Sequence, residues 1–469
     1  MEFDLVIIGG GPGGYPAAIR AAHFGYKVAI IEKYKLGGTC LHYGCIPTKV
    51  MFESSVITKI LNNSKDFGIK CENFTINFQQ ILSKKTQLIN QLENGIRNLL
   101  KNNKITVING HGKLQDPNTI KVYQENSEEL VIKTSNIIIA TGSKPLIPNI
   151  PGIELKGVIS SNEIFNLSEL PSKLTIIGGG VIGIELGCIF NTLGSEVNII
   201  EMLPNILPTI DNEITTYYSK IIKKEGIKLF LDSKVILLEK EPNTEKIITR
   251  FKNLKNNNTE TIISDLVLVS IGRIPNIDDL GLENCGIELI DKKIKVNEYL
   301  ETNVTGIYAI GDVIGGIMLA HVATFEGLIA VNNILNKNKV KVEYNVIPNC
   351  IFSIPEIASV GFTEDELKQK GIKYKIGKFP NLANSRSLIM GETRGFTKII
   401  CDENNKILGV HIIGPHATDM ISEASLAMKN NLTINDLIKT IHPHPTLSET
   451  IFEAGLDLFG YPIHILKRR

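Results

Sequence analysis

The sequence is poor in features that would place the protein in a membrane or on nucleic acid. It has 469 residues, no tryptophan and no apolar run of about 18 residues, so we expect no membrane-spanning segment. Lys and Arg number 50 against 49 Asp and Glu, and we expect no nucleic-acid partner. The chain opens with MEFDLVIIGG, already typical of a strand and a glycine turn. We therefore expect no signal or transit peptide and a cytoplasmic location, with the mitochondrial matrix as the open alternative.

Cysteine is also scarce, and its scatter excludes a secreted disulfide framework. The seven cysteines are Cys40, Cys45, Cys71, Cys188, Cys285, Cys350 and Cys401. Only Cys40 and Cys45 are close in sequence, and the other five are predicted to be small buried hydrophobic residues. A tetrahedral metal site needs about four ligands, and no second close Cys or His pair has a matching spacing, so no metal site is expected.

What the sequence does contain is a repeat of one dinucleotide-binding pattern. The segments Phe3–Lys33 and Ser172–Met202 each give a β-branched run, three glycines, a helical stretch and a second apolar run ending in an acid. The distance from first glycine to acid is the same in both copies. Two matched copies predict two dinucleotide sites far more strongly than one glycine motif would.

In each copy, the first glycine allows a tight turn, the second lets a pyrophosphate approach, and the third lets helix and strand pack closely. The acid at the end of the second strand is expected to bind a ribose hydroxyl. The residues with these expected roles are Gly9, Gly11, Gly14 and Glu32 in the first copy, and Gly178, Gly180, Gly183 and Glu201 in the second.

Glu201 favours NAD over NADP, because a carboxylate repels a 2′-phosphate and the following Met202, Leu203 and Pro204 supply no compensating base. Glu185, two residues past the third glycine, is expected either to contact nicotinamide or only to favour the helix dipole.

The repeat extends to whole domains. Each βαβ unit is followed by an antiparallel meander and an apolar strand ending in glycine, so the fold class is α/β with two Rossmann-like dinucleotide-binding domains, the second inserted in the first. We expect an FAD-binding domain at 1–147, an NAD-binding domain at 148–275, a return to the FAD-binding domain at 276–345, and a C-terminal α+β dimerisation domain at 346–469.

Cys40 and Cys45 lie in GGTCLHYGCIPTK, Gly37 to Lys49, directly after the first βαβ unit. That position predicts a redox pair near a flavin bound by the first domain. Two free thiols, or half of a metal site, are the alternatives. Lys49 would place a positive charge near the flavin and the thiolate.

GGTCLHYGCIPTK resembles the redox helix of the pyridine nucleotide–disulfide oxidoreductases. The resemblance continues through ATGSKP, SIGRIPN, TGIYAIGDV and MLAH to the ending IHPHPTLSE, which is similar to the branch that oxidises dihydrolipoamide. It implies further FAD or NAD contacts by residues of these motifs, namely Thr141, Gly142, Ser143, Gly272, Asp312, Met318, Leu319, Ala320 and His321.

The resemblance also implies the chemistry. Cys40 would meet the substrate, Cys45 would be the flavin-proximal thiol, and Lys49 would lie near the flavin. His444 would deprotonate the dithiol with Glu449 orienting its imidazole, and a homodimer would deliver His444 across the interface. The implied activity is oxidation of dihydrolipoamide with reduction of NAD, on a lipoyl-bearing subunit of a 2-oxo acid dehydrogenase or glycine-cleavage complex.

Some alternatives stay open. Thr446-x-x-Glu449 also fits a helix capping box, and Thr324-Phe325 stands where the family has an acidic pair. A glutathione or mercuric reductase type of enzyme is a second candidate, although the former would use NADPH and no Cys pair follows Cys401. A redox-silent FAD/NAD-binding interaction protein is the third, and the retained Cys pair, Lys49 and His444 argue against it.

Overall fold

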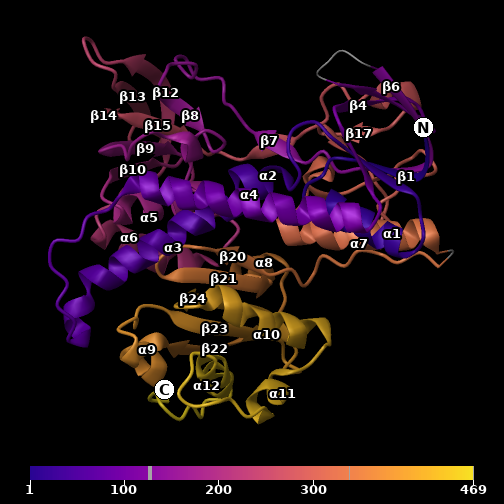
Figure 1. Ribbon diagram of the computed structural model, residues 1–469. Coiled ribbons are helices and arrows are strands. Elements are labelled where there is room, and N and C mark those ends of the chain that lie inside the picture. Colours follow the sequence, from indigo (N-terminus) through magenta and orange to yellow (C-terminus); the bar gives the residue numbers. More distant parts are fainter. Residues whose placement is uncertain (125–128, 337, 468–469) are drawn as a thin grey trace.

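The computed structural model describes residues 1–124, 129–336 and 338–467. Figure 1 shows two sheet-containing bodies at opposite ends of the long helix α4, with the C-terminal part of the chain packed below them. Residues 125–128, which fall within the expected first meander, lie outside the described residues.

The N-terminal body is a sheet in the order β3-β2-β1-β6-β5-β4, with β19 beside β6. Its strands are β1 (Glu2–Ile8), β2 (Val28–Glu32), β3 (Thr106–Asn109), β4 (His111–Asp116), β5 (Thr119–Tyr123), β6 (Glu129–Ile139) and β19 (Ile307–Ala309). The β3-β2-β1-β6-β19 part is parallel, and β4 and β5 form the antiparallel meander with β6.

Both faces of this sheet are buried, which is why its strands read as nearly continuous apolar runs. Leu5 and Ile7 pack against Ala17 of α1 and Ala330 of α7, whereas Val6 packs on the opposite face with the meander. The helices and short elements of this body are α1 (Gly14–His23), α2 (Gly38–Tyr43), α3 (Cys45–Asn62), η1 (Ser64–Phe67), α4 (Phe78–Asn102), η3 (Leu282–Cys285), β17 (Leu289–Ile290), β18 (Lys293–Ile294), η4 (Gly311–Ile314) and α7 (Ala320–Leu335).

The second body is inserted between β6 and β19. Its parallel sheet has the order β11-β10-β9-β15-β8, and the meander β12-β13-β14 forms a separate antiparallel sheet. The elements are β8 (Val158–Ser160), η2 (Ile164–Asn166), β9 (Lys173–Ile177), α5 (Val181–Thr192), β10 (Glu196–Ile200), α6 (Asn212–Lys224), β11 (Lys228–Phe230), β12 (Ser233–Lys240), β13 (Ile247–Asn253), β14 (Thr259–Ser264) and β15 (Leu266–Val269). The chain enters and leaves it through the antiparallel pair β7 (Ser143–Pro145) and β16 (Arg273–Pro275).

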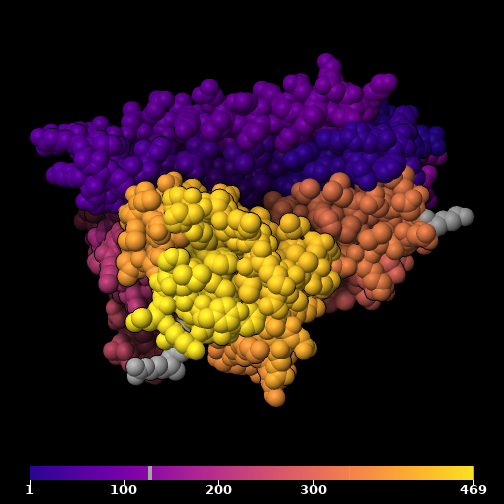
Figure 2. Space-filling view, turned by 90° about the horizontal axis from the view of Figure 1, so that it is seen from below, coloured from indigo at the N-terminus to yellow at the C-terminus, as the bar shows by residue number. Residues whose placement is uncertain are grey.

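The C-terminal body is an antiparallel sheet in the order β20-β21-β24-β23-β22 with helices packed on it. Its elements are β20 (Asn349–Ile351), β21 (Glu356–Gly361), α8 (Glu364–Gln369), β22 (Lys375–Pro380), η5 (Asn381–Ala383), α9 (Ser385–Ile389), β23 (Phe396–Cys401), β24 (Ile407–Gly414), α10 (Ala417–Lys429), α11 (Ile434–Lys439) and α12 (Glu449–Leu458). Seen from below in Figure 2, this body (yellow) stands in front, bordered on one side by the N-terminal part of the chain (indigo to purple).

The predicted fold class is confirmed. Because β19 returns to pair with β6 of the first sheet, the second Rossmann-like unit is an insertion in the first. Among the residues that the structure describes, no helix is both long and apolar enough to cross a bilayer.

Candidate active site

A single large cavity, about 1420 Å³ in volume, runs between the two glycine loops and past the cysteine pair. Most predicted cofactor and redox residues line it: Gly9, Gly11, Glu32, Cys40, Cys45, Lys49, Thr141, Gly142, Ser143, Gly178, Gly180, Glu185, Glu201, Gly272, Asp312, Met318, Leu319 and Ala320. The volume exceeds the roughly 300–1,000 Å³ of ordinary single-ligand pockets. It therefore has room for more than one large ligand.

The first and third glycines of each loop are required by the backbone. Gly9 and Gly178 both have φ of +109°, the left-handed region that favours glycine. A Cβ on Gly14 would lie 1.9 Å from the carbonyl oxygen of Gly9, and one on Gly183 would lie 2.1 Å from that of Gly178. The third glycines therefore let helix and strand approach, and neither is among the cavity-lining residues.

The second glycines face open space. A Cβ on Gly180 would meet nothing within 4 Å, and one on Gly11 would find its nearest neighbour, the Cα of Gly38, at 3.8 Å. The protein itself does not need glycine at these positions for packing. The room in front of the helix N-termini of α1 and α5 suits a pyrophosphate, as the glycine pattern predicts.

The two acids are held in the same way. Oε2 of Glu32 accepts from the Gly10 N–H at 2.7 Å and Oε1 from the Tyr34 N–H at 2.8 Å. Glu201 repeats this with the N–H groups of Gly179 at 2.6 Å and Leu203 at 2.7 Å. Each carboxylate is thus fixed by its own loop and keeps lone pairs for the hydroxyls of a ribose. Burial raises the pKa of Glu32, which its backbone hydrogen bonds partly offset.

Cys40 and Cys45 lie at the junction of α2 and α3, with Cys40 inside α2 and Cys45 the first residue of α3. Gly44 between them has ψ of −106° and would place a Cβ 3.2 Å from the Thr39 carbonyl oxygen, so glycine eases the turn that brings the cysteines together. Both are free thiols in this structure, and their side chains are hydrogen-bonded to each other.

The two thiols are electrostatically different. The hydrogen bond from Cys40 lowers the pKa of Cys45 to about 7; burial opposes this, and the charge of Lys49 adds to it. The same hydrogen bond and burial raise the pKa of Cys40 well above its ordinary value. These opposite shifts favour the thiolate at Cys45 and the protonated thiol at Cys40.

Lys49 pairs with Glu185, a contact that the sequence did not reveal. Its Nζ lies 3.1 and 2.9 Å from the two carboxylate oxygens of Glu185 and 4.4 Å from the ring centre of Phe352. The Phe352 N–H also donates to Glu185 at 2.9 Å. The ion pair joins α3 of the first body to α5 of the inserted one, beside the cysteine pair.

A second unpredicted residue, Arg273, also lines the cavity. Its Nε donates to the hydroxyl of Ser143 and its Nη2 to the Ser143 carbonyl, both at 2.7 Å. The Ser143 hydroxyl donates to Asp312. Burial lowers the pKa of Arg273, and the neighbouring Asp312 opposes this shift. Arg273 belongs to the SIGRIPN segment, and this motif is the sequence signal from which Arg273 could have been identified as a site residue.

The MLAH segment divides between cavity and surface. Met318, Leu319 and Ala320 line the cavity, whereas His321 is not among the lining residues and its Nε2 is hydrogen-bonded to the Pro348 carbonyl at 3.0 Å. Thr324, which replaces an expected acid, donates to the Pro12 carbonyl at 2.8 Å and so ties α7 to the first glycine loop.

His444 and Glu449 lie outside this cavity within one chain. Nδ1 of His444 is 2.8 Å from Oε1 of Glu449, and the imidazole is 68% exposed. Oε2 of Glu449 accepts from the Thr446 N–H at 2.8 Å. Only this half of the expected capping box forms: the Thr446 hydroxyl donates to Pro443 instead, and α12 begins at Glu449. The Glu449 carboxylate therefore binds both the Thr446 backbone and the His444 imidazole.

The expectation that the remaining cysteines are buried is wrong for three of them. Cys188 and Cys401 are buried, but Cys71, Cys285 and Cys350 are only half-buried, and Cys350 lines the cavity. In the described ranges 1–124, 129–336 and 338–467, no group of three or more His, Cys, Asp or Glu side chains is arranged to hold a metal ion.

Two glycine cradles and a polarised dithiol in one cavity define a dinucleotide-dependent disulfide oxidoreductase. The family model described as pyridine nucleotide-disulphide oxidoreductase matches residues 3–327, and the model of that family's dimerisation domain matches 347–454. The chain belongs to the pyridine nucleotide–disulphide oxidoreductase family, and its C-terminal body is the dimerisation domain of that family.

Relatives narrow the class further. The chain is 44% identical to a dihydrolipoyl dehydrogenase of Bacillus subtilis, with 99% of each chain covered. It is 42% identical to the mitochondrial dihydrolipoyl dehydrogenase of Pisum sativum, covering 99% of this chain and 93% of that one. Among solved structures, the copper(II) complex of the HOCl-induced flavoprotein disulfide reductase RclA from Escherichia coli superposes with a TM-score of 0.87 at 28% identity, over 97% of this chain and 99% of that one.

Proposed function

We propose that the protein is an NAD-dependent dihydrolipoyl dehydrogenase, which oxidises protein-bound dihydrolipoamide to lipoamide through Cys40, Cys45 and FAD. The observation that carries the proposal is the position of the Cys40–Cys45 pair and Lys49 in the cavity that both glycine loops share. The names of the relatives supply the substrate, and the carboxylate of Glu201 supplies the preference for NAD.

The first glycine loop, Glu32, Ser143 and Asp312 would hold FAD, and the second loop with Glu201 would hold NAD. The open space at Gly11 and Gly180 and the two preorganised carboxylates fit these groups. When bound, FAD accepts two electrons from the cysteine pair and returns them as a hydride to NAD+. The protein positions both groups and manages the thiol and proton chemistry.

The thiol chemistry begins with the Cys40–Cys45 disulfide. A substrate thiolate attacks Sγ of Cys40, a mixed disulfide forms and Cys45 leaves as a thiolate. The second substrate thiol then attacks the mixed disulfide and releases Cys40 as a thiol, so the substrate loses two electrons and two protons and the cysteine pair gains the two electrons. The charge of Lys49, which lowers the pKa of Cys45, would stabilise Cys45 as the leaving thiolate.

His444 would take the proton of the attacking substrate thiol, whereas the proton of the second thiol ends on Cys40. Its Nδ1–H donates to Glu449, which leaves Nε2 as the basic nitrogen. Free thiols titrate near pH 8.5, so a base is needed at neutral pH. Because His444 is exposed and lies in the dimerisation domain, we propose that it completes the cavity of a second copy of the chain in a homodimer.

Lys49 would stabilise the Cys45 thiolate, and Glu185 would keep the lysine in place.

For the partner we propose a lipoyl-bearing subunit of a 2-oxo acid dehydrogenase or glycine-cleavage complex, and for the location the cytoplasm or the mitochondrial matrix. The FAD and NAD domains would follow the boundaries expected from the sequence.

An anaerobic titration tests the proposal. Stoichiometric dihydrolipoamide added to the FAD-loaded protein should reduce the cysteine pair and give a long-wavelength flavin absorbance band from the neighbouring Cys45 thiolate. The Cys45→Ser variant is the matched control, because it keeps a group of similar size and loses the thiolate. If the wild-type protein gives no such band, or the variant gives the same band, the assignment of Cys45 is wrong.

A further inference from the structure

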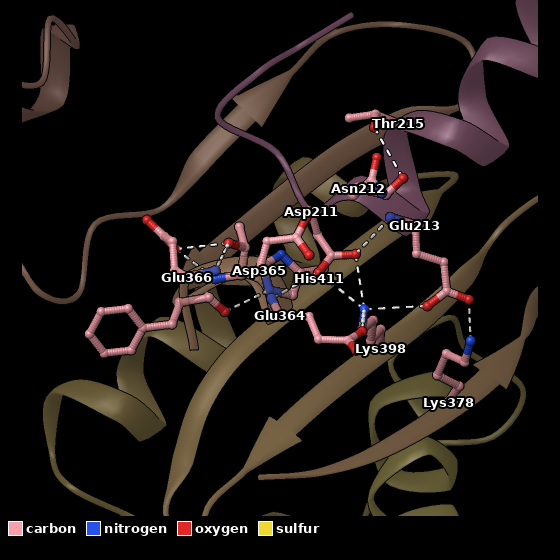
Figure 3. A network of polar contacts seen from close by, with 12 residues as sticks. Asp211, Asn212, Glu213, Thr215, Glu364, Asp365, Glu366, Lys378, Lys398 and His411 are labelled. Atoms are coloured by element: carbon pink, nitrogen blue, oxygen red, sulfur yellow. Dashed lines mark hydrogen bonds and ion pairs between the residues drawn. The ribbon is translucent and has the colours of Figure 1, made fainter. Parts of the chain in front are cut away.

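Lys398 is a fully buried cation that the proposed chemistry does not use. It lies on β23 of the dimerisation domain with 0% exposure. Its Nζ is 3.0 Å from both carboxylate oxygens of Asp211, 2.8 Å from Glu364 and 3.3 Å from Glu213. Figure 3 shows the ammonium group between these carboxylates. A buried ammonium with several carboxylate partners holds its neighbours in fixed positions.

Two of these carboxylates belong to the inserted NAD domain. Asp211 is the N-cap of α6, accepting from the Glu213 N–H at 3.1 Å, and is only 1% exposed. It also accepts from the backbone N–H of Glu364 in the dimerisation domain at 3.2 Å. The start of α6 is thus fastened to the dimerisation domain by the ion pairs of Lys398 with Asp211 and Glu213, by the ion pair of Lys378 with Glu213, and by a hydrogen bond.

Asp211 is also the last residue of the loop that begins at Glu201, the acid proposed to bind the NAD ribose. We call residues 201–211 the ribose loop. Its first residue, Glu201, holds the Gly179 N–H, and farther along the Leu207 N–H donates to the Gly179 carbonyl at 2.9 Å. Met202 and Leu203 line the cavity while exposed by 53% and 41%. The exposed cavity side of the loop is therefore held by the contacts of Glu201 and Leu207 with Gly179, by burial of Ile206, Leu207 and Ile210 in the core, and by the position of Asp211 at its end.

We infer that Lys398 is a positioning residue for NAD: it anchors the end of the ribose loop at Asp211 and so keeps Glu201 and the second glycine loop in their binding arrangement. The inference rests on the proposed use of Glu201 for the NAD ribose. It assigns to the dimerisation domain a part in coenzyme binding, in addition to carrying His444.

The strand geometry predicts that this effect is selective. Neighbouring residues of a strand point to opposite faces. Lys398 faces α6, whereas the adjacent Thr397 has its hydroxyl 2.8 Å from that of Thr450 on α12, next to Glu449. Removing the Lys398 amine therefore leaves the support of the His444–Glu449 pair in place. The substrate dithiol should be bound and oxidised as before at saturating NAD.

The test is calorimetric binding of NAD+ to the FAD-loaded Lys398→Met protein, with steady-state kinetics beside it. If the loop then keeps its binding arrangement about a fifth of the time, the Kd for NAD+ rises about fivefold. The KM for NAD+ should rise in parallel, with kcat and the KM for dihydrolipoamide unchanged. Lys59→Met is the matched control, because it removes a 2.8 Å ion pair with Glu225 at the other end of α6.

A second variant separates positioning from stability. Lys398→Met leaves the buried Asp211 charge unpaired, whereas Asp211→Asn/Lys398→Met removes that charge and keeps a good N-cap. The inference predicts that the double variant regains thermal stability while its Kd for NAD+ stays raised. It is overturned if the affinity returns together with stability, if Lys398→Met binds NAD+ like the wild type, or if Lys59→Met weakens binding as much. Wild-type protein that binds no NAD+ at all would instead overturn the proposed function, and this inference with it.

Discussion

Removing the hydrogen-bond donor at Cys40 should raise the pKa of Cys45. The pKa of Cys45 is lowered from 9.0 to about 7, and the largest cause is the hydrogen bond from Cys40. Two pKa units correspond to about 3 kcal/mol in favour of the thiolate. At pH 7 about half of Cys45 is then ionised, against about one molecule in a hundred at the ordinary pKa.

Cys40→Ala and Cys40→Ser form a matched pair for this prediction. Neither variant can form the disulfide, so Cys45 stays reduced in both, and both retain Lys49. The serine hydroxyl can still donate to the Cys45 sulfur, whereas alanine cannot. We expect Cys45 to titrate near its wild-type pKa in the serine variant and about one to two units higher in the alanine variant.

The assay is the rate of iodoacetamide alkylation at Cys45, followed by peptide mass spectrometry across the pH range. Only the thiolate reacts, so the rate rises with pH through the pKa. At pH 7 the alanine variant should react about five to fifty times more slowly than the serine variant, since a shift of one to two units lowers the thiolate fraction from about one half to about one tenth or one hundredth. Identical titrations of the two variants would refute the hydrogen bond as the main cause.

Three further predictions concern the base and the glycine loops. His444→Gln should slow dihydrolipoamide oxidation by about 10² to 10⁴-fold, the usual contribution of a general base, with the FAD content unchanged; loss of flavin would instead mark His444 as structural. Glu449→Gln loses the charge and one of the two acceptor oxygens that bind Thr446 and His444. It should lower kcat for dihydrolipoamide by about tenfold or more, and a rate equal to that of the wild type would contradict the orienting role. Gly180→Ala should melt at the wild-type temperature, because its Cβ meets no protein atom within 4 Å. It should nevertheless bind NAD+ about tenfold more weakly, because the methyl group crowds the pyrophosphate. Gly14→Ala should lose the folded FAD domain, since its Cβ lies 1.9 Å from the Gly9 carbonyl oxygen. Calorimetric melting and coenzyme titration of the two glycine variants check these roles. A destabilised Gly180→Ala protein, or a stable Gly14→Ala protein, would contradict them.

The parts of the site predictable from sequence are those that local spacing determines. The turn at Gly9, the close packing at Gly14, and the pairing of each loop with its acid all follow from one βαβ unit. The same holds for Cys40 and Cys45, which are close enough in the chain for a single glycine-containing turn to join them. Contacts between distant parts of the chain do not change these local features.

The missed contacts join segments that are far apart in the chain. Lys49 and Glu185 come from α3 and α5, and in the sequence alone nothing shows that the two side chains pair. Lys398 reads as one charge in an alternating strand, and nothing local shows that three carboxylates surround it. Cys350 seemed a core residue, yet β20 brings it to the cavity.

The central claim is tested most directly by steady-state turnover of the purified, FAD-loaded protein. Rates with dihydrolipoamide and NAD+ should far exceed those with glutathione disulfide and NADPH, and Cys45→Ser should abolish the former. Preference for glutathione disulfide and NADPH, or no dithiol-dependent reduction of NAD+ at all, would contradict the proposed activity.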